Sequence, residues 1–139
     1  MTTIVVKMKP VTQGSVTAIP VNGRARIIHN HSKDLYIQRE LIQSLYADAG
    51  GEKYEGAVKM RISFTFIRPK SISAKKRPNM TVKPDLDKLV RAVLDALTHH
   101  AYDDDSQVTV IECEKRYSDM ESIVITVTED EGESSYIKI

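Results

Sequence analysis

Residues 57–67 alternate cleanly between apolar and polar side chains, and this pattern strongly limits the folds open to the chain. Apolar side chains recur at every second position, from Val58 through Ile62 to Phe66, and Lys59 falls between them. Successive side chains of a β-strand point to opposite faces, so the pattern predicts a strand with one buried face. That buried face needs a covering layer on one side of the sheet.

Two amphipathic segments are predicted to form the helices of that layer. The first begins beyond Ser32, its expected N-cap, and ends at Gly50-Gly51. Its predicted buried face consists of Leu35, Leu41, Ile42 and Leu45. The second begins near Asp85 and ends near Thr98. Its apolar face consists of Leu86, Leu89, Val90, Val93, Leu94 and Leu97.

Further strands complete the expected sheet. They are predicted at residues 4–9, 16–21, 24–29, 107–117 and 121–128. Asn22-Gly23, a strong signal for a two-residue hairpin, joins the second and third of these. The last two are expected to be antiparallel and joined by residues 118–120, and Cys113 is expected to be a buried small hydrophobic residue. The order of elements predicts an α+β domain, with two main helices on one face of a mixed or antiparallel sheet.

The length of 139 residues suits one domain. We place this domain at residues 1–128 and expect residues 129–139 to form an acidic C-terminal tail. No apolar run is long enough to span a bilayer, and the N-terminus lacks the pattern of a signal peptide. The single cysteine excludes an internal disulfide and zinc sites built on cysteine pairs. We therefore expect a cytoplasmic protein with no membrane partner.

Charge is segregated along the chain, although the formal net charge is only +1. From Lys59 to Arg91 there are ten basic and two acidic residues, whereas residues 103–133 contain eleven acidic and two basic ones. A segregated basic stretch is typical of proteins that bind polyanions. Residues 68–83 carry six basic residues and no acidic one, which predicts a flexible loop that holds a nucleic-acid backbone. Tyr102 and Tyr117 are expected to pack within the fold, and stacking on bases is the alternative.

Two groups of carboxylates are candidates for chemistry. Asp85 and Asp87 converge only if Asp85 precedes the helix, and Pro84 favours that extended start. A different explanation is that one aspartate caps the helix and the other complements its dipole. The triplet Asp103-Asp104-Asp105 either surrounds a cation or forms a solvated turn.

The two carboxylate groups could meet at one end of the sheet, because helix and strand can be neighbours. A site of oxygen ligands alone suits Mg²⁺ or Mn²⁺, and beside a basic loop it fits phosphodiester hydrolysis. Arg91 lies four residues after Asp87 on the same helical stripe. Either Arg91 or the nearby Lys88 stabilises a phosphate, or Arg91 belongs to a surface ladder of ion pairs from Asp87 to Asp95.

Taken together, these residues resemble the RusA family of Holliday-junction resolvases. The family pattern Asp-x-Asp-Asn-Leu-x-Lys is similar to Asp85-Leu86-Asp87-Lys88-Leu89-Val90-Arg91, which is followed by Asp95-Ala96-Leu97 and by Asp104-Asp105-Ser106-Gln107. The segment Pro10-Val11-Thr12-Gln13-Gly14-Ser15 also resembles an opening found in relatives, many of them phage-borne. The resemblance covers mainly Lys83 to Tyr117.

This resemblance implies a RusA-like fold and a homodimeric, Mg²⁺-dependent endonuclease that resolves four-way DNA junctions by paired cuts. It assigns metal binding to Asp85, Asp87 and Asp105. Catalysis also involves Arg91, at the position of the family's lysine, or Lys88, at that of its asparagine. Lys115 matches a lysine in the strand after the acidic loop. The expected DNA contacts are Arg68, Lys70, Lys75, Lys76, Arg77, Lys83 and Lys115.

Two other functions remain open on the sequence alone. The first is a catalytically silent protein that only binds branched DNA, since Lys88 and Arg91 replace the family's asparagine and lysine. The other is a small interaction domain whose aspartates serve only as caps and turns.

Overall fold

The computed structural model describes residues 1–12, 16–29, 33–134 and 136. In chain order its elements are β1 (Thr2–Val6), β2 (Val16–Val21), β3 (Arg24–His29), α1 (Lys33–Asp48), β4 (Val58–Ile67), α2 (Leu86–Leu97), the 3₁₀ helix η1 (Asp105–Gln107), β5 (Val108–Ser118) and β6 (Ser122–Glu129). The order of strands and helices is the predicted one. The first strand begins and ends earlier than expected, at Thr2–Val6 instead of residues 4–9.

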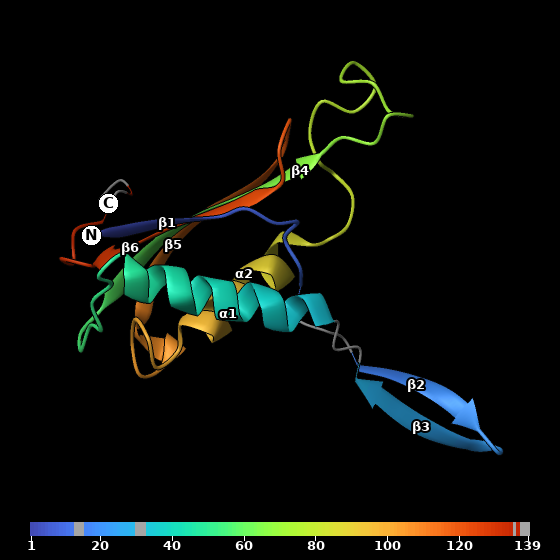
Figure 1. The fold of residues 1–139 in the computed structure, drawn as a ribbon, viewed down its shortest axis with the longest axis horizontal. Helices are drawn as coiled ribbons and strands as arrows, with labels where there is room; N and C mark the ends of the chain where they lie inside the picture. The colour runs from blue at the N-terminus through green and yellow to red at the C-terminus, as the bar shows by residue number, and fades with distance from the viewer. Residues whose placement is uncertain (13–15, 30–32, 135, 137–139) are drawn as a thin grey trace.

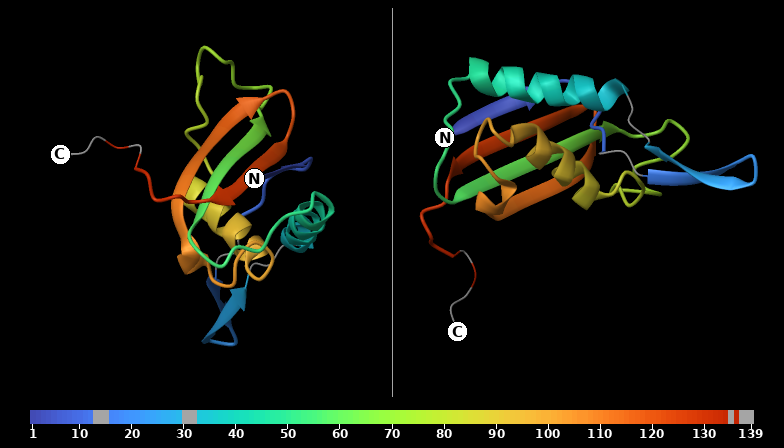
Figure 2. Two further views of the ribbon diagram at one scale, coloured as in Figure 1. Left: turned by 90° about the vertical axis from the view of Figure 1, so that its left-hand side faces the viewer. Right: turned by 90° about the horizontal axis from the view of Figure 1, so that it is seen from below.

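Four strands form a mixed sheet in the order β1-β6-β4-β5. Strand β6 is antiparallel to both β1 and β4, whereas β5 is parallel to β4. The apolar side chains of β4, including Val58, Ile62 and Phe66, are buried as the alternation predicts. Figures 1 and 2 show α1 and α2 on the same face of this sheet. The α+β architecture with two helices on one face is therefore confirmed.

The last two strands are antiparallel and joined by a short connection as predicted, but they are not neighbours in the sheet. Strands β5 and β6 run in opposite directions, but β4 lies between them and pairs with both. Ile67 aligns with Ser118 and Thr65 aligns with Ser122, so the short connection passes over the end of β4. It has to cross two strand spacings, about 9.6 Å, which a few extended residues span easily. The β4–α2–β5 crossover thus inserts β5 as a parallel edge strand.

The position of β5 at the sheet edge also corrects the expectation for Cys113, which is exposed. In register it pairs with Ile62, a buried residue on the helix-facing side of β4. A central strand is covered by neighbours on both sides, whereas an edge strand has one open flank. Alternation along the sequence does not distinguish these two cases.

Helix α1 buries a slightly different face from the predicted one. Leu35 and Ile42 are buried as expected, but Leu41 is 38% exposed. Its place is taken by Gln38, whose side-chain oxygen accepts a hydrogen bond from the Val11 amide at 2.7 Å and whose amide donates to the Val11 carbonyl at 3.0 Å. These two bonds satisfy a buried polar group, so it can face the core. The helix ends before Gly50, whose φ of 72° is left-handed, as predicted.

The predicted hairpin is confirmed. Strands β2 and β3 pair in antiparallel register around Asn22 and Gly23, both of which have positive φ. The hairpin forms its own two-stranded sheet and extends away from the main sheet (Figure 1). Ser32, the expected N-cap of α1, and residues 13–15 of the preceding loop lie outside the described residues.

Candidate active site

The start of α2 presents the first pair of candidate carboxylates. Asp85 stands before the helix with extended backbone (φ −71°, ψ 140°), and its carbonyl accepts the amide of Leu89 at 3.2 Å. Its carboxylate makes no capping hydrogen bond. The nearest cation is the ammonium of Lys88, 3.8 Å away, and the side chains of Asp85 and Lys88 are 51% and 57% exposed. Asp85 therefore precedes the helix as predicted, but capping does not explain its carboxylate.

Asp87 and Arg91 are exposed on the first turns of the same helix. Within the described residues, Asp87, Arg91 and Asp95 form no ion pair with one another. The surface ladder considered as an alternative is thus wrong. What the helix start offers instead is two exposed carboxylates close in sequence to two exposed cations, Lys88 and Arg91.

Lys115 fixes the backbone immediately before this helix. It aligns with Phe64 on the helix-facing side of the sheet. Its ammonium donates to the carbonyl of Val82 at 2.7 Å and to that of Pro84 at 2.9 Å. Hydrogen bonds from a charged donor are among the stronger ones in proteins. Lys115 therefore holds the position of the chain that leads into Asp85, a role that the sequence does not signal.

The basic loop between β4 and α2 is organised by turns and by one aromatic ring. The guanidinium of Arg68 lies 4.4 Å from the ring centroid of Tyr117 and also donates to the carbonyl of Arg77. Arg77 in turn donates to the hydroxyl of Tyr117 at 3.3 Å. Two of the six basic side chains of this loop thus have partners within the protein.

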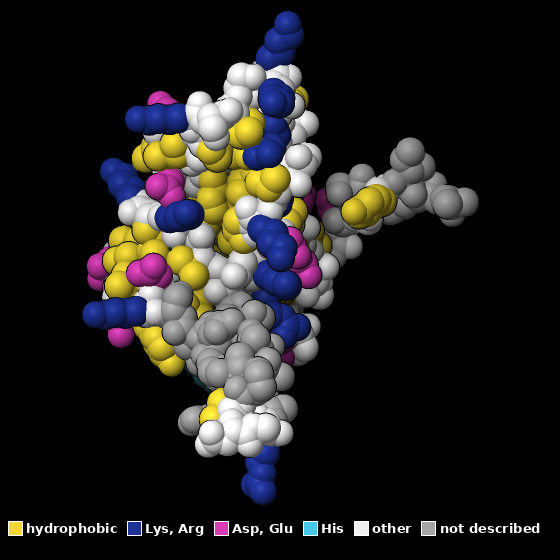
Figure 3. Space-filling model, turned by 90° about the vertical axis from the view of Figure 1, so that its right-hand side faces the viewer, with side chains coloured by type: hydrophobic (Ala, Val, Ile, Leu, Met, Phe, Trp, Pro, Cys, Tyr) yellow, Lys and Arg dark blue, Asp and Glu magenta, His cyan; other side chains and the backbone are white. Residues whose placement is uncertain are grey.

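The remaining four basic side chains of this loop are exposed: Lys70, Lys75, Lys76 and Lys83. Figure 3 views the end of the molecule where this loop lies, and Lys and Arg side chains are spread along that face with apolar side chains between them. The loop therefore presents positive charge to solvent beside the start of α2.

The acidic turn before β5 contains three aspartates with different surroundings. Asp103 forms an ion pair with Lys53 at 2.5 Å, which lowers the pKa of its carboxyl group. Asp104 accepts the amide of Ser106 at 2.9 Å, and this hydrogen bond lowers the pKa of Asp104. Asp104 also forms a capping box with Gln107, whose amide donates to the carbonyls of residues 54 and 56.

Asp105 differs from its two neighbours. It is exposed at the first position of η1, and no ion pair in the described part of the chain includes it. Of the three aspartates, it is the one with neither a salt bridge nor a capping role, so it is the best placed to bind a ligand.

The structure does not bring the two carboxylate groups together within one chain. Helix α2 has 12 residues and is about 18 Å long, with Asp85 before its start and Asp105 beyond its end. Because β5 is parallel to β4, the crossover that contains α2 must return from the end of β4 to the start of β5 (Figure 1). No group of three metal-ligating side chains forms within the described residues. The expectation that both groups meet at one end of the sheet is wrong for a single chain.

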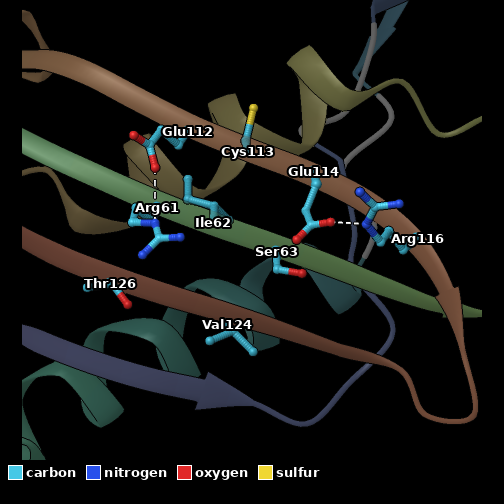
Figure 4. A pocket seen from close by; sticks show the side chains of 9 residues that line it. All are labelled: Arg61, Ile62, Ser63, Glu112, Cys113, Glu114, Arg116, Val124 and Thr126. Carbon is cyan, nitrogen blue, oxygen red and sulfur yellow. Dashed lines mark hydrogen bonds and ion pairs between the residues drawn. The ribbon is translucent and has the colours of Figure 1, made fainter. Parts of the chain in front are cut away.

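A hollow of about 420 Å³ on the outer face of the sheet offers no comparable site (Figure 4). Arg61 pairs with Glu112 at 3.1 Å, and Arg116 pairs with Glu114. Since each charge is balanced by its neighbour, we assign this hollow no role.

Comparison with known proteins agrees with the resemblance seen in the sequence. The family model of endodeoxyribonuclease RusA matches residues 9–128. An uncharacterised protein of Bacillus subtilis (strain 168), YqaN, is 28% identical over 130 residues, which cover 87% of this chain and 91% of that protein. Among the described residues, no helix has the length and apolar character needed to cross a membrane.

Proposed function

We propose that this chain, which belongs to the RusA family of endodeoxyribonucleases, resolves four-way DNA junctions by Mg²⁺-dependent phosphodiester hydrolysis. The observation that carries the proposal is the start of α2. There, the Asp85 carboxylate is not used as a helix cap and Asp87 has no ion-pair partner among the described residues. Lys88 and Arg91 lie beside them, and the exposed lysines of the basic loop are close by in the chain.

The side chains at this helix start supply two of the three ligands expected for a divalent cation. Two exposed carboxylates are suitable ligands for Mg²⁺, and Mn²⁺ accepts the same atoms. The third expected ligand, Asp105, is at the far end of α2 in the same chain. We infer that the site is completed in a homodimer, where Asp105 of the partner subunit joins Asp85 and Asp87. A two-fold dimer then has two such sites, which suits the two-fold symmetry of a junction.

The side chains around this site have distinct proposed roles. Asp85, Asp87 and Asp105 would hold the ion, which when bound supplies an activated water and neutralises charge on the phosphate. Arg91 or Lys88 stabilises the negative charge that develops on the scissile phosphate. Arg91 offers a planar fork of donors, whereas Lys88 is a compact point charge that already lies 3.8 Å from Asp85. The expected products carry 5′-phosphate and 3′-hydroxyl ends.

The exposed lysines at positions 70, 75, 76 and 83 are proposed to hold the DNA backbone. Such contacts carry little sequence information, and binding through them weakens steeply as the salt concentration rises. We place the nuclease domain at residues 1–128, because the family match ends at residue 128, and treat residues 129–139 as an acidic tail.

The direct test is incubation of the purified protein with a synthetic four-way junction and with a linear duplex of matched sequence. We expect paired cuts in the junction with Mg²⁺, none without it, and none in the duplex. Binding of the junction without any cutting, across Mg²⁺ and Mn²⁺, would instead identify a catalytically silent DNA-binding protein. Absence of both binding and cutting would favour an interaction domain.

Replacing Lys115 by Met tests its positioning role. The substitution removes the ammonium from the Val82 and Pro84 carbonyls, and the chain leading into Asp85 loses its anchor. We expect cleavage to fall about 100-fold, as for a small displacement of a catalytic group. Each of the two lost hydrogen bonds should lower the free energy of unfolding by at most about 3 kcal/mol.

Cleavage rates and thermal melting measure these two effects separately. The matched control is Lys7→Met, since Lys7 is an exposed lysine just beyond β1. Wild-type cleavage by the Lys115 variant would show that the hydrogen bonds to the two carbonyls do not position the site.

A further inference from the structure

A cavity lies between the basic loop and the end of the sheet, next to the proposed active site. It has a volume of about 230 Å³. Its lining includes Phe66 and Met80, which belong to the hydrophobic core, and Tyr117 from the end of β5. Lys9 and Lys83, both exposed, and Glu121 also line it. The lining thus combines apolar side chains with two lysines and one glutamate.

The position of this cavity links it to the candidate catalytic residues. Lys83 and Pro84 line it and immediately precede Asp85. The backbone there is held by the two hydrogen bonds from Lys115. The ring of Tyr117 is fixed in turn by Arg68 over one face and by Arg77 at its hydroxyl. The backbone before Asp85 and the ring of Tyr117 are therefore both held in place relative to the proposed site of hydrolysis.

We propose that this cavity takes one unstacked DNA base beside the cleaved phosphate, an inference that rests on the proposed nuclease function. The volume is below the about 300–1,000 Å³ of typical small-molecule sites, so it suits a single flat ring system. An apolar wall with an aromatic ring is the surface on which unstacked bases bind, and the two lysines of the lining suit the flanking phosphates. A base next to a strand crossover costs less to unstack than one inside a duplex.

Glu121 is the acidic residue in the cavity lining, and it restricts how a nucleotide enters. Its carboxylate repels phosphate, so we expect the phosphates to lie at the two lysines and the base to lie against the apolar side chains. A carboxylate can also accept a hydrogen bond from the exocyclic amino group of a base. The cavity therefore gives the protein a means to select the nucleotide at the cut, which the lysine loop cannot do.

The test combines removal of the base with filling of the cavity. Val82 lines the cavity and is 37% exposed, and its contact with Lys115 is through the backbone, so Val82→Phe fills the space with little effect on the fold. Junction affinity is measured without Mg²⁺, in an Asp87→Asn background, for a series of junctions that each carry one abasic site near the crossover. Val82→Ala leaves the cavity open. Thr81→Phe adds the same ring at an exposed neighbour outside the lining.

We expect one abasic position to weaken binding by about 5- to 150-fold, the range for loss of one stacked base. The Val82→Ala and Thr81→Phe proteins should keep this sensitivity, and the Val82→Phe protein should lose it. Intact junction binding with no position sensitive to base removal overturns the base site alone. Failure to prefer junctions over linear duplex overturns the proposed function and the base site with it.

Discussion

The Asp87→Asn protein is expected to bind four-way junctions and to leave them uncut. The substitution keeps the size of the side chain but removes a charged oxygen ligand from the proposed metal site. Loss of an outer partner of a metal ligand costs about 10–100-fold in affinity or activity, so loss of a ligand should lower cleavage by at least about 100-fold. Junction affinity should be retained or increased, because a negative charge near the DNA is removed.

Cleavage in Mg²⁺ and binding in its absence are the two measurements. Asp87 is exposed and has no ion pair within the described residues, so stability should change by less than about 0.5 kcal/mol. Asp34→Asn is the matched control, since Asp34 is an exposed aspartate in the first turn of the other helix. Full cleavage by the Asp87 variant would reject the carboxylate site at α2.

A mixed dimer of Asp87→Asn and Asp105→Asn subunits is expected to regain activity that neither parent dimer has. If each site takes Asp87 from one subunit and Asp105 from the other, the mixed dimer contains one site with both substitutions and one site with none. The intact site should nick a single strand of the junction. If all ligands came from the same chain, both sites of the mixed dimer would be damaged.

Subunits with two different affinity tags allow the mixed dimer to be purified by successive capture. A junction labelled on each strand in turn then shows which strands are cut. Wild-type dimers should give paired cuts and each parent dimer none. A purified mixed dimer that leaves every strand intact would contradict a site shared between subunits.

The fold was predicted correctly wherever a residue pattern was compatible with only one kind of structure. Alternation in β4 indicated its buried face, and the long apolar stripe of α2 indicated its bounds. The pattern did not indicate which strands are neighbours in the sheet, because that depends on the rest of the fold. Strands β5 and β6 follow each other closely in the sequence, yet both pair with β4, which lies between them.

The candidate site, too, was predictable from the sequence only in part. The identities of Asp85, Asp87 and Asp105 were predicted, and the surroundings of Asp103 and Asp104 now separate them from Asp105. The distance between the two carboxylate groups was not predicted, because it depends on β5 being parallel to β4. Likewise, nothing in the sequence pattern pairs Lys115 with the carbonyls before α2, since the two are 31 residues or more apart.

The crossover through α2, from the end of β4 to the start of β5, has a consequence for the regulation of the proposed nuclease activity. Helix α2 separates the two acidic groups of one chain, and under the proposed function an isolated copy would therefore lack a complete set of metal ligands. In the proposed arrangement, scission depends on the encounter of two copies and rises more steeply than the first power of protein concentration. At low protein concentration few complete sites then form, so other DNA is left uncut. A four-way junction that binds both copies brings them together and so activates its own cleavage.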